Sequence, residues 1–386
     1  MYAKRTVIFV SEMYLSLRQR SSTHIMIDNI ITGMLEAGYE ILFIAISNKN
    51  EKKAIIDKYE KLGIRVVFWE TQISREVSNK YLNLWNNYVN IVKGIAIPRN
   101  VREELENFRN ENTVLLSHSP SVESVHICKK IKKGLRIRYI QYWSDPISLG
   151  GILPEQFGIK RVPFWIIENN ALGSADEIVY GTRSLMIHQK KLFTKHSARM
   201  RWVKVAYTKK KATEHISKNN KIIVLYSGNY YSSIRNIEPL YEAMRQVGSK
   251  FQLYVYGRGD CNLNDTDNVE IHDRIDYEQM QVIEANADIQ ICILNRSCIQ
   301  IPGKVFYNTD LDQNILVLLD GKYKNDIQKE LEEYCRFDFC ENNTKSIVEF
   351  LNGYSILENG MRNKNNNEAL SAKNVAIEIL QTASTK

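Results

Sequence analysis

The sequence lacks the features of a membrane-spanning, secreted or disulfide-stabilised protein. It has no run of eighteen apolar residues, so no transmembrane helix is expected. The first apolar run, Thr6–Val10, is too short for a signal peptide, which predicts a cytoplasmic protein. The six cysteines show no Cys-x-x-Cys spacing and have no well-placed histidine partner. We therefore expect ordinary thiols and no bound metal.

Acidic residues are scarce in the first half of the chain. Residues 1–215 hold 34 Lys and Arg against 20 Asp and Glu, a net charge of +14, whereas the remaining residues carry −6. This asymmetry predicts an anionic partner for the first half, either an anionic membrane surface or nucleic acid. No nucleic-acid recognition motif accompanies the charge, so we expect no nucleic-acid partner.

Short apolar segments alternate with longer amphipathic segments along the 386 residues, a length typical of two α/β domains. Near-continuous apolar segments are typical of parallel strands that are buried on both faces. In the first half we expect strands at 6–10, 40–46, 64–68, 113–117, 137–142 and 177–180, and helices at 23–37, 51–62 and 122–133. In the second half we expect strands at 222–226, 251–256, 288–293 and 315–319, and helices at 237–247, 277–285 and 367–382.

A lysine-rich stretch over residues 204–220 interrupts this alternation and indicates a domain boundary. We expect an N-terminal Rossmann-like domain over 1–205, a linker over 206–220 and a second Rossmann-like domain over 221–366. A helix over 367–386 should pack back toward the first domain. Doubly wound sheets bind ligands at the carboxyl ends of their strands, so the site is expected in a cleft between the domains.

Glycines and basic residues follow the expected strands of the second half. Gly228 follows the strand at 222–226, and Arg235 precedes a helix whose N-terminal N–H groups could bind a phosphate. Arg235 could bind a diphosphate in bidentate fashion, although a solvated surface arginine is the more common outcome. Gly257 follows the next strand, and Lys304 follows a Pro-Gly pair in a loop.

In order and spacing, the segment Ile222–Leu319 resembles the C-terminal domain of family-4-like glycosyltransferases of the GT-B fold. Besides the residues named above, the shared elements are Gly257-Arg258-Gly259, a helix that begins at Tyr277, Ala287-Asp288, and Pro302-Gly303-Lys304-Val305-Phe306. The first half resembles the acceptor domain of that family more loosely. The matching segments there are His118-Ser119-Pro120, Tyr142-Trp143-Ser144-Asp145-Pro146 and Ser174-Ala175-Asp176.

The resemblance implies two Rossmann-like doubly wound parallel-sheet domains that face a central cleft. It also implies transfer of a sugar from a nucleoside-diphosphate sugar, with UDP-sugar the expected donor, to a glycan or lipid-linked acceptor. The reaction would be retaining and metal-independent, and would serve surface polysaccharide or glycolipid biosynthesis.

The resemblance also assigns roles to single residues. Arg235 and Lys304 would stabilise the leaving diphosphate, and His118 would contact the sugar or orient the acceptor hydroxyl. Ser119 and Asp145 would bind substrate. The alternative for His118 is a purely structural role. The alternative for Asp145 is that it fixes a turn, because an aspartate before a proline can form hydrogen bonds with the local backbone. The nucleotide would be bound by a further group: Gly228, Asn229, Gly257, Tyr307 and Asp310.

Three positions depart from the family pattern. Tyr307 replaces a glutamate that holds the nucleotide ribose, Asn229 replaces a basic residue, and Asp312 replaces a glycine. A phenol cannot accept hydrogen bonds from two ribose hydroxyls as a carboxylate does, so donor binding is either rebuilt by Asp310 or Asp312 or weakened. A catalytically inert homologue that acts as a scaffold is therefore an alternative, and a nucleotide-sugar epimerase of the same fold is another.

Aromatic and basic residues alternate between Tyr81 and Arg99, and basic clusters follow at 129–138 and 190–211. An amphipathic segment with tryptophan and flanking cations can lie in a membrane interface. We therefore expect peripheral attachment to the inner face of the cell membrane, with ordinary core packing of Trp85 as the alternative.

Overall fold

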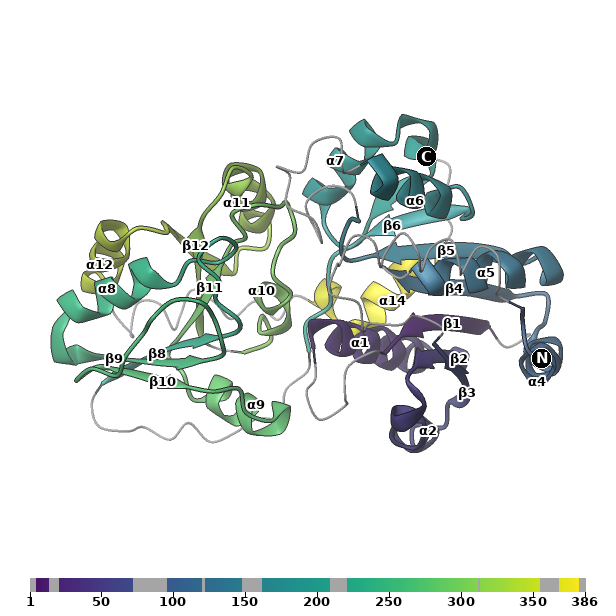
Figure 1. Ribbon diagram of the computed structural model, residues 1–386, viewed down its shortest axis with the longest axis horizontal. Coiled ribbons are helices and arrows are strands. Elements are labelled where there is room, and N and C mark those ends of the chain that lie inside the picture. The colour runs from purple at the N-terminus through teal and green to yellow at the C-terminus, as the bar shows by residue number, and fades with distance from the viewer. Residues whose placement is uncertain are drawn as a thin grey trace. The chain divides into compact units, whose positions relative to one another are not determined.

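The computed structural model describes residues 5–13, 21–71, 96–119, 122–147, 162–208, 221–311, 313–354 and 368–381. The chain divides into two compact units. Unit 1 comprises Met1–Ala206 together with Ala369–Lys386, and unit 2 comprises Tyr207–Glu368. Each unit is built on one parallel sheet with helices packed against it (Figure 1). The expected segment 81–95, the residues 209–220 and Asp312 lie outside the described residues.

The sheet of unit 1 has the strand order β3-β2-β1-β4-β5-β6-β7, and its neighbouring strands pair in parallel. The central strands are apolar along nearly their whole length and buried on both faces, as a parallel sheet covered by helices requires. The strands are β1 (Thr6–Glu12), β2 (Glu40–Ser47), β3 (Arg65–Glu70), β4 (Thr113–Ser119), β5 (Arg138–Trp143), β6 (Glu177–Tyr180) and β7 (Met200–Trp202).

The helices of unit 1 connect successive strands, except for the last, which arrives from unit 2. They are α1 (Ser22–Glu36), α2 (Lys52–Glu60), α4 (Arg99–Phe108), α5 (Val122–Leu135), α6 (Val162–Leu172), α7 (Arg183–Leu192) and α14 (Ala372–Leu380). Local caps fix where several of them begin. The Ser21 hydroxyl accepts from the backbone N–H of His24 at the start of α1, and the Thr182 hydroxyl accepts from Leu185 at the start of α7.

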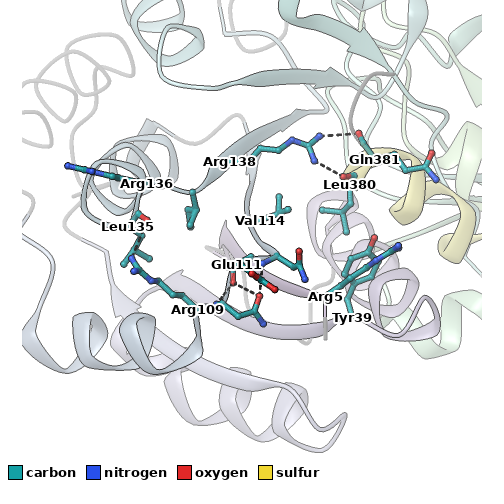
Figure 2. A pocket seen from close by; sticks show the side chains of 14 residues that line it. Arg5, Tyr39, Arg109, Glu111, Val114, Leu135, Arg136, Arg138, Leu380 and Gln381 are labelled. Atoms are coloured by element: carbon teal, nitrogen blue, oxygen red, sulfur yellow. Dashed lines mark hydrogen bonds between the residues drawn. The ribbon is translucent and has the colours of Figure 1, made fainter. Parts of the chain in front are cut away.

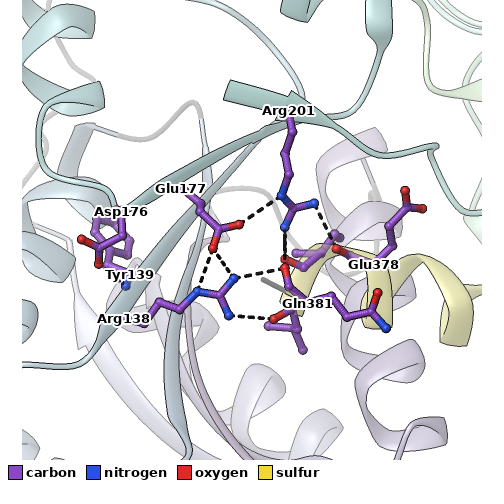
Figure 3. Close-up of polar contacts among 9 residues, drawn as sticks. Arg138, Tyr139, Asp176, Glu177, Arg201, Glu378 and Gln381 are labelled. Carbon is purple, nitrogen blue, oxygen red and sulfur yellow. Dashed lines mark hydrogen bonds and ion pairs between the residues drawn. The ribbon is translucent and has the colours of Figure 1, made fainter. Parts of the chain in front are cut away.

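The C-terminal helix α14 packs against α1 and is fixed to the sheet of unit 1. Gly33 permits the approach, because a Cβ at this position would lie 2.0 Å from the carbonyl oxygen of Ala372. Arg138 and Arg201 donate to backbone carbonyl groups at the end of α14, and Glu177 pairs with both guanidinium groups (Figure 3). The two cations also face the negative end of the helix dipole.

The sheet of unit 2 has the order β10-β9-β8-β11-β12-β13, again with parallel pairs. Its strands are β8 (Ile222–Ser227), β9 (Phe251–Tyr256), β10 (Val269–His272), β11 (Ile289–Ile293), β12 (Asn314–Leu319) and β13 (Phe337–Glu341). Its helices are α8 (Glu238–Gln246), α9 (Tyr277–Ala285), α10 (Lys304–Tyr307), α11 (Lys324–Glu332) and α12 (Thr344–Asn352). In the described residues no helix combines the length and apolar character needed to cross a membrane.

The predicted alternation of strands and helices is confirmed, and every predicted element overlaps an observed one. The sequence analysis missed several elements, each for a physical reason. β10 is short and carries charged residues, and β13 is half-buried along its whole length, so neither forms an apolar run. α6 carries apolar residues on all its sides, so no helical period marks it.

Gly33→Ala is expected to destabilise the protein by about 1–3 kcal/mol, because the added methyl group overlaps a backbone carbonyl and forces α1 and α14 apart. The urea-unfolding midpoint, followed by circular dichroism, measures the effect. Gly134→Ala in α5 is the matched control, because an added Cβ there meets no described atom within 4 Å. Its helix propensity should leave stability equal or slightly higher. A Gly33→Ala midpoint equal to that of the wild type would contradict the close approach of the two helices.

Candidate functional site

Both sheets contain a switch point, where strands that are neighbours in the sheet continue to opposite sides of it. In unit 2 it lies between β8 and β11, and in unit 1 between β1 and β4. The loops that follow these strands diverge, and open α/β sheets bind ligands there. The predicted site residues of each unit follow these strands or their neighbours.

Lys304 is the first residue of α10, and its ammonium group is held beside the carboxyl end of β8. The Nζ atom donates to Ser227 Oγ at 2.5 Å and lies 3.0 Å from Glu284 Oε1. Ser227 donates to the same carboxylate oxygen at 3.0 Å. Glu284 is 4% exposed, whereas the Lys304 side chain is 36% exposed. The ammonium group therefore neutralises a buried carboxylate and still reaches solvent.

Arg235 lies in the turn that precedes α8. Its Nε donates to Asn295 Oδ1 at 2.7 Å, and its guanidinium group also forms a hydrogen bond with the Tyr226 phenol. Burial raises the pKa of Tyr226 well above its usual range, and the charge of Arg235 opposes that rise. Both of these partners are neutral. The positive charge of Arg235 is therefore shared by hydrogen bonds but not cancelled by them.

Arg235 and Lys304 lie at the ends of neighbouring strands: Lys304 contacts Ser227 at the end of β8, and Arg235 contacts Asn295 just after β11. Both influence Cys292, the fourth residue of β11. Burial raises the pKa of this thiol to about 12, Lys304 and Arg235 lower it, and Glu284 raises it. Two cations and one carboxylate thus act on the same point between β8 and β11. The balance is positive, which favours an anionic ligand.

The N-terminus of α8 does not provide the phosphate site that the sequence indicated. Its first two residues are Glu238 and Pro239. Proline has no N–H group, the glutamate places a negative charge where a phosphate would bind, and the Glu238 N–H already donates to Asn236 Oδ1 at 3.2 Å. Side-chain cations therefore supply the positive potential of this site, and the helix contributes little.

The glycines of unit 2 are explained by packing of the protein against itself. A Cβ at Gly257 would lie 1.9 Å from the carbonyl oxygen of Gly228, so the loops after β8 and β9 could not meet. A Cβ at Gly228 would meet only ordinary contacts. The next residue, Asn229, accepts a hydrogen bond at its Oδ1 from Arg274 Nε at 3.0 Å. An exposed arginine thus stands beside the position where a basic residue was missing.

Tyr307 is 2% exposed, so its ring is not presented to a ligand. Asp310 is half-buried in the turn after α10. Arg336 holds this turn by donating to backbone carbonyl groups on both sides of Asp310. Asp312 lies outside the described residues, so its predicted contribution to donor binding stays a prediction.

His118 lies at the switch point of unit 1, near the carboxyl end of β4. It is 3% exposed, its Nδ1 lies 3.3 Å from Ser11 Oγ, and its ring stacks on Tyr142 with centroids 6.0 Å apart. The Nε2 atom has no hydrogen-bond partner among the described residues. Burial lowers the pKa of His118 to about 4, so the imidazole is neutral, and the unpartnered Nε2 atom is itself buried.

Ser119 and Asp145 lie at the same edge of the unit 1 sheet as His118. Ser119 pairs with Trp143 in the register of β4 and β5, and its side chain is outside the described structure. Asp145 follows the end of β5, where its Oδ2 accepts from the Ser144 hydroxyl at 3.2 Å. This contact is local, and the substrate-binding role expected for Asp145 stays a prediction.

The sequence analysis missed Ser227, Glu284, Asn295 and Arg274. Glu284 had the clearest signal, because it follows Met280 by four residues and shares the buried face of α9. An ionisable residue on the apolar face of a helix needs a buried partner. Asn295 and Arg274 lie in loops, and only the fold brings them to Arg235 and Asn229.

A wide depression of about 1170 Å³ lies in unit 1 at the amino ends of β1, β4 and β5, and contains none of the predicted site residues (Figure 2). It is lined mainly by polar and charged side chains, among them Arg5, Arg109, Arg136 and Arg138. Arg138 is already bound to the end of α14. The depression is at the edge opposite His118, so we do not place the reaction there. Among the described residues no group of His, Cys, Asp or Glu side chains is arranged to hold a metal ion.

No family model and no curated protein matches the sequence. Solved structures are similar in fold at low identity. A glycosyltransferase from Rickettsia africae is similar with a TM-score of 0.60 and 12% identity, over 99% of this chain and 100% of that chain. HepE from Anabaena in complex with UDP-glucose is similar with a TM-score of 0.57 and 9% identity, over 97% and 94%. A UDP-N-acetylglucosamine 2-epimerase is similar with a TM-score of 0.56 and 11% identity, over 98% and 95%. The chain therefore has the GT-B fold, with two Rossmann-like α/β units.

The lowered pKa of His118 predicts a pH-dependent contribution to stability. Between pH 6.5 and 4 the unfolded chain binds a proton at this histidine and the folded protein does not. The stabilising contribution is therefore complete above pH 6.5 and is lost as the pH falls toward 4.

His118→Asn retains a hydrogen-bonding atom for Ser11 and does not titrate. Between pH 7 and pH 4.5 the wild type should lose roughly 2–3 kcal/mol more unfolding free energy than this variant. Urea unfolding at the two pH values measures the difference, in which the other histidines cancel. A difference that does not change with pH would mean that His118 is protonated as readily in the folded protein as in the unfolded one.

Proposed function

We propose that this chain is a glycosyltransferase that moves a sugar from a nucleoside-diphosphate sugar to a glycan or lipid-linked acceptor. The observation that carries the proposal is the convergence of Arg235 and Lys304 at the switch point of unit 2. A site at the carboxyl ends of β8 and β11 with two cations and one carboxylate fits the diphosphate of such a donor. HepE, which has the same fold, is known in complex with UDP-glucose, and UDP is our proposed nucleotide.

The chemistry follows from charge development. As the bond between the sugar and the diphosphate breaks, negative charge grows on the leaving oxygen. Lys304 and Arg235 are fixed by Ser227, Glu284 and Asn295, so little reorganisation is needed to stabilise that charge. Two fixed cations can supply the neutralisation that a divalent cation provides in other enzymes, and we propose a metal-independent reaction. Retention of configuration is proposed from the sequence resemblance alone.

Arg274 is our proposed third cation. In the resembling family a basic residue directly follows the strand glycine, and this chain has Asn229 there. The contact between Arg274 Nε and Asn229 Oδ1 returns a positive charge to the same loop from a different part of the chain. The substitution at 229 is in this way compatible with diphosphate binding.

The acceptor is proposed to bind near His118. Its imidazole is neutral, and Nε2 is buried and unpartnered in the described structure, so a hydroxyl of the sugar or acceptor would have to displace the covering residues to form a hydrogen bond with it. Ser119 and Asp145 share the strand-end edge with His118 and are proposed to line the same acceptor site.

An inert scaffold is the second candidate, and Tyr307 is the observation that favours it. The ring replaces the ribose-binding glutamate and is buried, so that contact to the nucleotide is not rebuilt at the same position. In that case the cations of unit 2 would have a structural task, the neutralisation of Glu284. The two candidates differ in whether the chain binds a nucleotide.

A thermal-shift screen against UDP, GDP, ADP, CMP, dTDP and their sugars tests the proposal. A ligand at a hundredfold its dissociation constant adds about 2.7 kcal/mol of stability, which raises the melting temperature measurably. Lys304→Gln removes the charged hydrogen bond to the diphosphate, so it should weaken nucleotide binding roughly 10- to 100-fold. A double variant, Lys304→Gln with Glu284→Gln, should bind as weakly without leaving a buried charge unpaired.

Lys329→Gln is the matched control, because Lys329 is an exposed lysine of α11 in the same unit. It should respond to nucleotide as the wild type does. Stabilisation by one nucleotide that is lost in both Lys304 variants supports the transferase. No stabilisation of the wild type by any nucleotide would favour the scaffold, and turnover of a UDP-sugar to its epimer without acceptor would favour the epimerase.

A further inference from the structure

Helix α6 exposes apolar side chains to solvent. Val162, Trp165 and Ile166 are 37–49% exposed and lie at helical spacing on one side of its first turns. The opposite side buries Phe164 and Ile167 in unit 1. A helix with apolar residues on all sides is normally buried on all sides, so one face of α6 lacks the environment that its sequence fits.

Helix α7 continues this apolar surface. The two helices are joined by a hydrogen bond from Gln189 Nε2 to Glu168 Oε1 at 3.1 Å and by stacking of Trp165 on Phe193 with centroids 5.8 Å apart, and they appear together in Figure 1. Ile187 and Leu192 of α7 are exposed to a similar degree as the residues of α6. The exposed aliphatic and aromatic groups therefore belong to one pair of packed helices and not to scattered elements.

Basic residues lie on and just after α7, one of the same two helices. The segment 178–208 contains seven Lys and Arg and no Asp or Glu. Lys190, Lys191 and Lys195 lie at the end of α7 and just beyond it, and no ion pair of theirs is found among the described residues. The α6–α7 face is defined here by its apolar and basic members: Val162, Trp165, Ile166, Ile187, Leu192, Lys190, Lys191 and Lys195.

We propose that the α6–α7 face binds the surface of an anionic lipid bilayer. Tryptophan and aliphatic side chains can enter the boundary between headgroups and acyl chains, and lysines beside them pair with anionic headgroups. Nucleic acid would be attracted by the lysines, but it offers nothing for the aliphatic groups. The surface differs from the segment between Tyr81 and Arg99 that the sequence analysis singled out.

The position of this face suits a lipid-linked acceptor, and this part of the inference rests on the proposed function. α6 follows β5, so its first turn lies toward the carboxyl ends of the strands of unit 1, as in any strand–helix–strand unit. His118 and Asp145 lie at that same edge. A membrane bound at the α6–α7 face would hold the lipid end of an acceptor close to the side of unit 1 that carries His118.

Co-sedimentation with vesicles of phosphatidylcholine, with and without phosphatidylglycerol, tests the proposal in the absence of any nucleotide. The full chain should bind only the anionic vesicles, and less at high salt. Trp165→Ser with Ile166→Ser should weaken binding roughly tenfold or more, because the apolar contact is lost. Lys191→Gln with Lys195→Gln should weaken it about fivefold for each lysine at low salt.

Two control variants match these changes elsewhere in unit 1. Leu62→Ser removes an apolar group that is 49% exposed, and Lys52→Gln with Lys53→Gln removes two exposed lysines of α2; both should bind as the wild type does. Melting temperatures confirm that each variant is folded, and the nucleotide response is measured separately, so failure of the proposed function does not affect this result. Absent vesicle binding, or α6–α7 variants that bind like the wild type, overturns the proposal. A concentration-dependent dimer that Trp165→Ser abolishes would overturn it in favour of a second copy of this chain.

Discussion

The strand order of the two sheets is the constraint from which the candidate site follows. Because β8 pairs with β11 and β1 with β4, residues far apart in the sequence meet at the end of each pair. Ser227 at the end of β8 contacts Lys304 and Glu284, whose charges act on Cys292 of β11, and Ser11 of β1 lies beside His118 of β4. The loops that follow the two strands of each pair continue to opposite sides of the sheet. A crevice is therefore left between them, and polar groups lie along it.

The two cations of unit 2 are held by different kinds of partner. Lys304 faces a buried carboxylate, which cancels its charge in the absence of ligand, whereas Arg235 faces an amide and a phenol, which do not. A diphosphate bound there, as we propose, would be attracted by Arg235 at once and would share Lys304 with Glu284. The pairing of Lys304 with Glu284 stabilises the empty site, because an unpaired buried charge would destabilise the fold.

Sequence reasoning recovered the alternating elements and the two parallel sheets, because apolar periodicity reports burial directly. It also singled out Arg235, Lys304 and His118, which the fold places near switch points, and their functional roles stay predictions. It could not find Asn295 or Arg274, since loop residues carry no periodic signal and their partners are distant in the sequence. The phosphate site at the start of α8 was expected from strand–glycine–helix order, but the first turn itself, with Glu238 and Pro239, argues against it.

The neutral state of His118 and the apolar α6–α7 face both fit the lipid-linked acceptor that we propose. A charged histidine at 3% exposure would need a counter-ion, and the surroundings of His118 are Ser11 and the ring of Tyr142. A neutral imidazole is suited to hydroxyl groups and tolerates an apolar neighbour. The proposed acceptor, with a sugar hydroxyl at one end and an acyl chain at the other, would use both surfaces. In unit 1 His118 and the first turn of α6 lie at the same edge of one sheet, opposite the arginine-lined depression.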